Sequence, residues 1–238
     1  MLVTVGCSRS GDARSPIAAN DSGLYSCESL RDWKDLGDAV IVGRLQSETS
    51  FPASTSSSVP EPFFGRLVTV AVERVVFSVR SVPDRITVLT LGWQADGQGN
   101  RQPLVSSDGT RLEVGDEIVA SIRQDPTKPG VWYSPGEPRC LVRVSGGTVV
   151  VAERGPQYLR PFAGISADAM AGRVAAEPVD PLSLRYRDLP AIERAAKVLE
   201  ARDAASSSST TTTTTTSSTT APSSSTSPTG SAPGTTGG

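Results

Sequence analysis

The sequence predicts a mainly β protein: a small closed or partly open β-barrel, followed by a C-terminal helix and flanked by disordered tails. Short β-branched runs, separated by turn-forming residues, recur between residues 38 and 151. A clear helical pattern appears only after them, over 188–201. From Ser206 onward the chain is almost entirely Ser, Thr, Pro and Gly. Such a segment buries too little apolar surface to offset the entropy of ordering it.

The strands are predicted one by one from their β-branched residues. A helix-like lead over 30–36 precedes the first, Asp38–Leu45, and a Ser/Pro-rich loop over 51–62 follows it. The second, over 66–79, places alternate valines on one face, and Arg74 interrupts that face, which indicates a bulge or a strand end. The remaining strands are expected at 85–93, 118–122, 131–133, 140–144 and 148–151, the last two joined by a Gly146-Gly147 turn.

Two helices are predicted beyond the strands. Ser166 is suited to cap a short helix over 166–176, and Pro190 lies in the first turn of a second helix over 188–201. These patterns divide the chain into a signal remnant and flexible tether (1–24), the barrel (25–155), a helical extension (156–204) and a disordered Ser/Thr-rich tail (205–238).

Composition argues against several classes of function. There are 23 basic and 25 acidic residues, giving a net charge of −2, and no basic stripe is interleaved with aromatics, so we expect no nucleic-acid partner. Histidine is absent, which removes the usual general base near neutral pH and the commonest metal ligand. We therefore expect no enzyme activity, with no catalytic, cofactor-binding or metal-binding residues.

One group of carboxylates leaves an enzymatic alternative open. Glu113, Asp116 and Glu117 cluster at a predicted turn, and paired carboxylates can perform acid–base work, as in glycosidases. A solvated turn leading into a strand accounts for them more simply.

The three cysteines stand at positions 7, 27 and 140. If Cys7 takes no part in a disulfide and the protein is exported, the remaining two cysteines predict one disulfide, Cys27–Cys140. It would close a loop of more than 100 residues, worth roughly 4–5 kcal/mol in the chain-entropy model. In a cytosolic protein both would instead be small buried apolar residues.

The segment Thr4-Val5-Gly6-Cys7 resembles the lipobox of bacterial lipoprotein signal peptides, with Thr4 in place of the usual Leu. The resemblance implies that Cys7 is lipidated and anchors the protein on the extracytoplasmic face of the cell membrane. Small and polar residues up to Ser22 suit a flexible tether. No Lys or Arg precedes Cys7, so either the true translation start lies upstream or the match is accidental. Lysine occurs only three times, which is typical of GC-rich genomes such as those of actinobacteria.

Residues 27 to about 151 resemble the netrin-like, tissue-inhibitor-of-metalloproteinase type of OB-fold. Three segments carry the resemblance: Asp38–Leu45, Val72–Phe77 and Leu112–Val119, the last containing Val114-Gly115-Asp116. It implies an OB-like barrel that begins at a cysteine. Inhibitors of that family chelate a protease's zinc through a free N-terminal Cys amine. Cys27 is internal, so this activity is not carried over.

Together these patterns predict an exported, membrane-tethered, non-enzymatic lipoprotein that acts as a binding module in the cell envelope. Its partners would be the membrane, through the lipid anchor, and an envelope protein or glycan. Trp93, Trp132 and Tyr133 are candidates for a ligand-binding face, although the core or rim of the barrel accounts for them more simply. The alternatives are a netrin-like protease-regulating protein and a cytosolic OB-fold ligand-binding protein.

Overall fold

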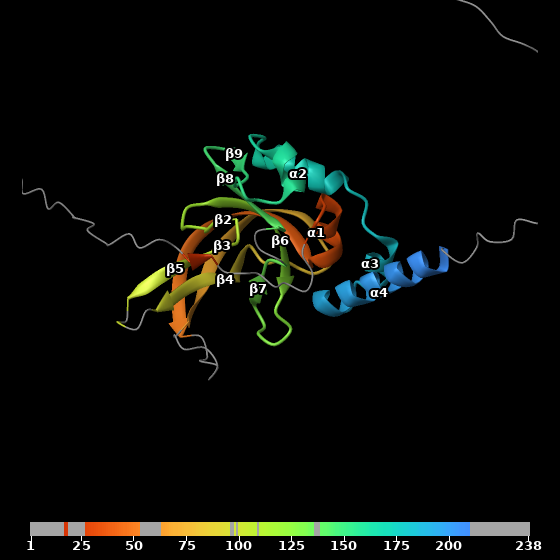
Figure 1. Ribbon diagram of the computed structural model, residues 1–238, viewed down its shortest axis with the longest axis horizontal. Coiled ribbons are helices and arrows are strands. Elements are labelled where there is room, and N and C mark those ends of the chain that lie inside the picture. The colour runs from red at the N-terminus through yellow and green to blue at the C-terminus, as the bar shows by residue number, and fades with distance from the viewer. Residues whose placement is uncertain are drawn as a thin grey trace, which may run out of the picture. The chain divides into compact units, whose positions relative to one another are not determined.

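A computed structural model describes residues 17–18, 27–52, 63–95, 98, 100–108, 110–135 and 139–209 (Figure 1). Helix α1 (Leu30–Leu36) precedes the long strands. The strands are β1 (Ile17–Ala18), β2 (Ala39–Pro52), β3 (Phe63–Ser78), β4 (Arg85–Ala95), β5 (Arg101–Val105), β6 (Glu117–Gln124), β7 (Val131–Tyr133), β8 (Leu141–Ser145) and β9 (Thr148–Val150). The last elements are a 3₁₀ helix, η1 (Gln157–Phe162), and helices α2 (Ala167–Ala176), α3 (Pro181–Arg185) and α4 (Ala191–Ser209).

The fold is mainly β, as predicted, and its centre is a ring of five strands. Strand β2 pairs antiparallel with β3 and β6, and β3 pairs antiparallel with β4. The short strand β7 closes the ring, parallel to β4 and antiparallel to β6. Beyond the ring, β8 and β9 continue the sheet from β6, while β5 and then β1 continue it from β4.

Two apolar cores lie on the opposite faces of β2. Ala39 and Ile41 point into the ring, and Val40 and Val42 point toward the helices. This explains why β2 opens with five buried residues in succession rather than an alternating pattern. The ring core also contains Leu45, Val68, Val70, Ile86, Val88, Leu112, Ile118, Ala120, Ile122, Trp132 and Leu141. The second core contains Trp33, Val119, Val142, Leu159, Met170, Val174 and Ala195.

Helix α1 is fixed at both ends. Its N-cap, Ser29, accepts a hydrogen bond from the Asp32 N–H, and the Asp32 carboxylate accepts from the Ser29 N–H at 2.9 Å, which completes a capping box. At its other end, Ser121 Oγ of β6 donates to the Trp33 carbonyl at 2.7 Å. A Cβ at Gly37 would lie 2.2 Å from Ser121 Oγ. Glycine therefore permits the close approach of α1 to β6.

A buried ion pair joins β2 to α4. Asp38 and Arg194 are each only 1% exposed, and Arg194 donates to Asp38 Oδ1 from Nη1 at 3.2 Å and from Nη2 at 3.1 Å. The half-buried Arg80 adds a third donor to this oxygen at 3.2 Å, and the Gln124 N–H donates to Asp38 Oδ2 at 3.0 Å. Burial lowers the pKa of Arg194, and the charge of Asp38 opposes that shift. The buried carboxylate thus has partners on three segments.

A second cluster of charges holds the segments before α3 and in α4 against α1. The buried Asp35 accepts from the Asp180 N–H at 2.9 Å and from Arg202 Nη2 at 3.0 Å. Arg202 also donates to Asp180 at 2.8 Å, and Arg31 pairs with both carboxylates. Burial opposes ionisation of Asp180, but the bonds from Arg202 and from the Leu182 N–H outweigh it, so the pKa of Asp180 is lowered.

Most predicted elements are present, with different ends. Arg74 lies within β3 between two register shifts, which confirms the predicted bulge, and Ser166 caps α2. Gly146 and Gly147 both have positive φ in the β8–β9 turn. Strands β1 and β5, η1 and α3 were not predicted, and β1 lies in the segment expected to be a flexible tether. The helices up to Arg202 form one compact unit with the ring. Helix α4 continues to Ser209, so the first residues of the segment expected to be disordered are helical, and the rest lie outside the described residues.

Replacing Arg194 tests the buried pair. Arg194→Met leaves the Asp38 charge buried with Arg80 as the one cation still paired with it among the described residues, so we expect the free energy of unfolding to fall by about 3–5 kcal/mol. Arg80→Met, at a half-buried position, is expected to cost about 1 kcal/mol. Urea unfolding of both variants checks this. Asp38→Asn combined with Arg194→Met should recover part of the loss. Equal, small effects of the two single variants would contradict the assignment.

Candidate functional site

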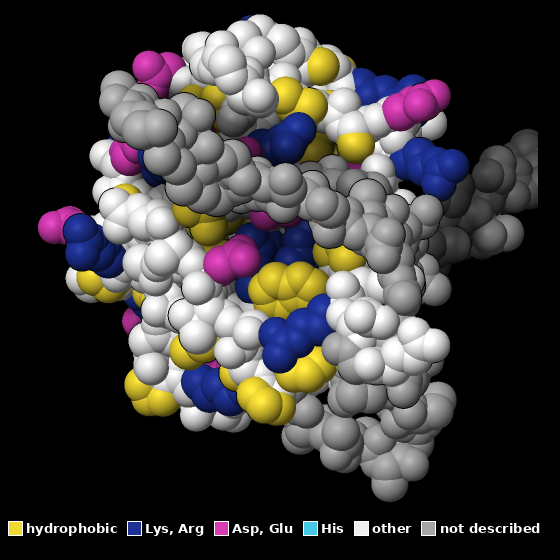
Figure 2. Space-filling model, turned by 90° about the vertical axis from the view of Figure 1, so that its left-hand side faces the viewer, with side chains coloured by type: hydrophobic (Ala, Val, Ile, Leu, Met, Phe, Trp, Pro, Cys, Tyr) yellow, Lys and Arg dark blue, Asp and Glu magenta, His cyan; other side chains and the backbone are white. Residues whose placement is uncertain are grey.

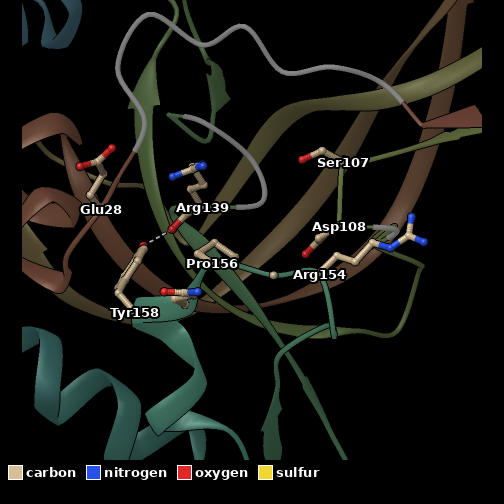
Figure 3. Close-up of a pocket in the computed structure, with 9 residues that line it drawn as sticks. Glu28, Ser107, Asp108, Arg139, Arg154, Pro156 and Tyr158 are labelled. Atoms are coloured by element: carbon tan, nitrogen blue, oxygen red, sulfur yellow. Dashed lines mark hydrogen bonds between the residues drawn. The ribbon is translucent and has the colours of Figure 1, made fainter.

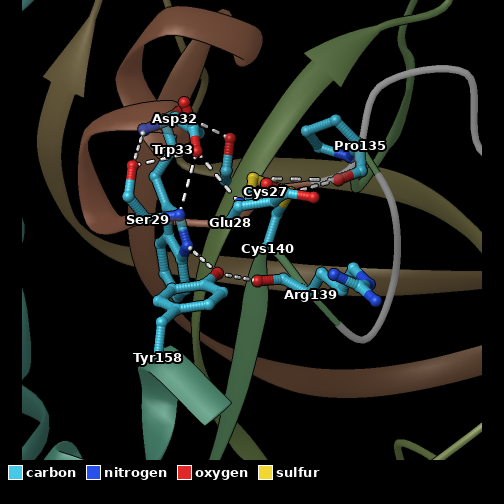
Figure 4. Close-up of a disulfide and its surroundings, with 10 residues drawn as sticks. Cys27, Glu28, Ser29, Asp32, Trp33, Pro135, Arg139, Cys140 and Tyr158 are labelled. Atoms are coloured by element: carbon cyan, nitrogen blue, oxygen red, sulfur yellow. Dashed lines mark hydrogen bonds between the residues drawn. A yellow bond between two sulfur atoms is a disulfide. The ribbon is translucent and has the colours of Figure 1, made fainter. Parts of the chain in front are cut away.

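The predicted disulfide Cys27–Cys140 is present, with 5.4 Å between the Cα atoms, and both cysteines are fully buried (Figure 4). Cys27 stands just before α1, and Cys140 stands immediately before β8. The bond therefore joins the start of the compact unit to its sheet across 113 positions of sequence. It also fixes the residues next to each cysteine, Glu28 and Arg139, on one surface.

Glu28 and Arg139 border a polar hollow of about 430 Å³ (Figure 3). Four separate segments line it: the lead into α1, the loop after β5, the residue before Cys140, and the turn into η1. Glu28 and Tyr158 lie on one side, and Ser107, Asp108 and Arg154 lie on the other. Gly155, Pro156 and Gln157 complete the lining.

Tyr158 forms the wall between the hollow and the core. Its hydroxyl accepts a hydrogen bond from Trp33 Nε1 at 2.8 Å and donates to the Arg139 carbonyl (Figure 4). Burial raises the pKa of the Tyr158 phenol. The hydroxyl therefore stays protonated at physiological pH, and its role here is to hold α1, η1 and the segment before β8 together.

The hollow carries charges of both signs. The Asp108 carboxylate is hydrogen-bonded within its own loop, since its Oδ1 accepts from the Thr110 N–H at 2.8 Å and from Ser106 Oγ. Among the described residues, no carboxylate pairs with the guanidinium of Arg139 or of Arg154, and no cation pairs with the Glu28 carboxylate. Such a rim suits a polar ligand or a protein surface that presents charges and hydrogen-bonding groups. It contains no cysteine thiol and no histidine that could form a nucleophile–base pair.

The three aromatic residues predicted to form a ligand face do not come together on one. Trp132 is 3% exposed and packs inside the ring of strands. The side chain of its neighbour Tyr133 points the other way and is half-buried, and the Arg123 guanidinium lies 4.5 Å from the centroid of the Tyr133 aromatic ring. Trp93 is half-buried and stacks with Arg111 at 4.8 Å. None of the three lines the hollow.

The carboxylate cluster of the turn before β6 is engaged in ion pairs and turn bonds. Glu113 pairs with Arg111 at 3.3 Å, and Glu117 pairs with Arg44 at 3.2 Å. Asp116 accepts from the Glu113 N–H at 2.8 Å, which stabilises the turn. The arrangement gives these side chains structural partners.

The residues of the hollow were missed because they share no motif. They come from four loops that only the folded chain brings together. The one available signal was that Glu28 and Arg139 directly adjoin the two paired cysteines.

The predicted lipidation site, Cys7, lies outside the described residues. In the part of the chain that the structure describes, no helix has the length and apolar character required to cross a membrane. The same part contains no cluster of three or more acidic or cysteine side chains placed to hold a metal ion.

No protein-family model matches this sequence, and no curated protein is significantly similar to it.

Removing the disulfide tests its contribution to stability. Because it closes a loop spanning 113 positions, Cys27→Ala with Cys140→Ala should lower the free energy of unfolding by roughly 4–5 kcal/mol. Urea unfolding with and without dithiothreitol measures this. The reductant should destabilise the wild type to the level of the double variant and leave that variant unchanged. A wild type that is insensitive to the reductant after unfolding and refolding in its presence would contradict the prediction.

Proposed function

We propose that this protein is an exported, membrane-tethered, non-enzymatic lipoprotein that serves as a binding module in a bacterial cell envelope. The observation that carries the proposal is the buried Cys27–Cys140 disulfide, which joins the segment before α1 to the start of β8. Disulfides of this kind form and persist in oxidising compartments outside the cytoplasm.

We further propose that the ring of strands is a small OB-like barrel of the netrin-like type. In support, the three segments that resemble this family occupy structurally decisive places. Asp38 holds α4, Val72–Phe77 carries the bulges of β3, and Gly115 adopts a φ of +99° in the turn into β6. A left-handed backbone there favours glycine, which gives Gly115 a structural role in this turn.

The membrane tether in this proposal is a lipid on Cys7. The lipobox-like segment around Cys7 and the oxidised pair downstream both fit passage across the cytoplasmic membrane. Two or more acyl chains would hold such a protein stably, whereas a single chain binds only marginally.

The binding role rests on the hollow beside the disulfide. Arg139, Arg154 and Glu28 offer charges that no described residue neutralises, on a frame fixed by Tyr158 and the disulfide. A preorganised polar rim of this kind suits an envelope protein or a glycan. Zinc chelation in the manner of netrin-like inhibitors does not suit Cys27, because its nitrogen is part of a peptide bond.

Detergent phase partitioning tests the tether. The protein, expressed from its native locus with the upstream DNA in an actinobacterial host, should enter the detergent phase because acyl chains are apolar. Cys7→Ala should remain in the aqueous phase, and Cys27→Ala with Cys140→Ala, as a matched cysteine control, should still partition into detergent. If the wild type stays aqueous in the cytosolic fraction, Cys7 is incidental, and a cytosolic ligand-binding role replaces this proposal.

A further inference from the structure

A short strand near the start of the chain runs alongside β5. Strand β1 pairs parallel with β5, with Ile17 opposite Leu104 and Ala18 opposite Val105. Because the two strands are parallel, the N-terminal side of Ile17 faces the end of β5 where Arg101 stands. The pairing therefore places Ile17 at the edge of β5.

The chain between the anchor and this strand is short. Nine residues, 8–16, separate Cys7 from Ile17. Even fully extended, the ten steps from Cys7 to Ile17 span at most about 35 Å. A lipid on Cys7 would thus keep Ile17, and the edge of β5 with which it pairs, within about 35 Å of the membrane surface.

Phe64, Trp93 and Arg101 gather at the end of β5 where Arg101 stands, and we call them the Arg101 patch. The Arg101 guanidinium lies 3.8 Å from the Phe64 ring centroid, and Phe64 is paired with Trp93 across β3 and β4. Arg101 is exposed and both aromatic rings are half-buried. Figure 2 faces the side of the molecule on which β5 lies in Figure 1, and it shows Lys and Arg side chains gathered around large hydrophobic ones.

The backbone is adapted to place these rings together. A register shift between Phe64 and Arg66 adds one residue to β4, so that Trp93 comes opposite Phe64. A Cβ at Gly92 would lie 1.9 Å from the Phe64 carbonyl oxygen, so only glycine allows β3 and β4 to approach here.

The charge at this end favours an anionic surface. Arg66 pairs with Glu48, and Arg111 pairs with Glu113. Arg101 donates to Ser50 Oγ at 3.1 Å but, among the described residues, has no carboxylate partner. An exposed arginine beside half-buried aromatic rings matches the interfacial layer of a membrane, where rings lie at headgroup level and cations meet anionic lipids.

We infer that the Arg101 patch faces and contacts the anionic phospholipid surface to which Cys7 is anchored. The inference rests on the proposed lipid anchor. It orients the domain, with the Arg101 end of β5 against the membrane.

Quenching of tryptophan fluorescence by brominated lipids tests this orientation. Trp33 is fully buried and Trp132 is 3% exposed, so Trp93 is the tryptophan able to report lipid contact. The full-length chain, purified from the host that expresses it from its native locus, is reconstituted into vesicles of phosphatidylcholine and phosphatidylglycerol, with and without bromine on the acyl chains. We expect a loss of fluorescence on bromination that Trp93→Phe abolishes and Arg101→Glu diminishes. Arg173→Glu, the same charge change at an exposed position on α2, should leave the loss unchanged.

Flotation of the same vesicles separates the two proposals. Protein that floats with the vesicles and shows quenching dependent on Trp93 supports the inference. Protein that floats without such quenching overturns the orientation while the anchor stands. Protein that does not float shows that the anchor itself is wrong, and the orientation fails with it.

Discussion

The carboxylate of Asp38 is the contact on which the rest of this structure depends. It lies immediately before β2, almost fully buried, and it is bonded to Arg194 of α4, to Arg80 and to the backbone of Gln124 at the end of β6. A carboxylate removed from water destabilises a fold strongly unless cations and hydrogen-bond donors surround it. The β core can therefore bury Asp38 only if the C-terminal helix docks, which makes the helices part of the same unit as the ring.

The candidate site follows from the same constraint. Helix α1 is held by Asp35 through Arg202 and Asp180, and at its start by the disulfide. With α1 fixed, Trp33 can donate to Tyr158, and Tyr158 in turn donates to the carbonyl of Arg139. The hollow is thus shaped by contacts between segments more than 100 positions apart. A hollow framed by such contacts would lower the entropic cost of binding the partner that we propose.

The strands could be predicted because β-branched residues recur in short runs whose burial depends mainly on local pattern. Strand β5 could not be predicted, since Pro103 and the polar residues around it resemble a loop, and the edge of β4 decides their conformation. The hollow was equally inaccessible, because no sequence spacing relates Glu28 to Arg154. Trp132 was a candidate for both a ligand face and the barrel core, since a large aromatic residue in a short strand suits either a surface or a core. Trp132 lies in the core because β7 closes the ring between β4 and β6, which is a tertiary contact.

Asp38 and the helix that neutralises it should open as one cooperative unit. Native-state hydrogen exchange followed by mass spectrometry measures this directly, comparing amides of residues 39–45 in β2 with those of residues 195–202 in α4 under increasing urea. The account predicts that both segments exchange through the same global unfolding event, with equal free energies and equal urea dependence. Exchange of α4 at a clearly lower free energy, while β2 remains protected, would contradict it.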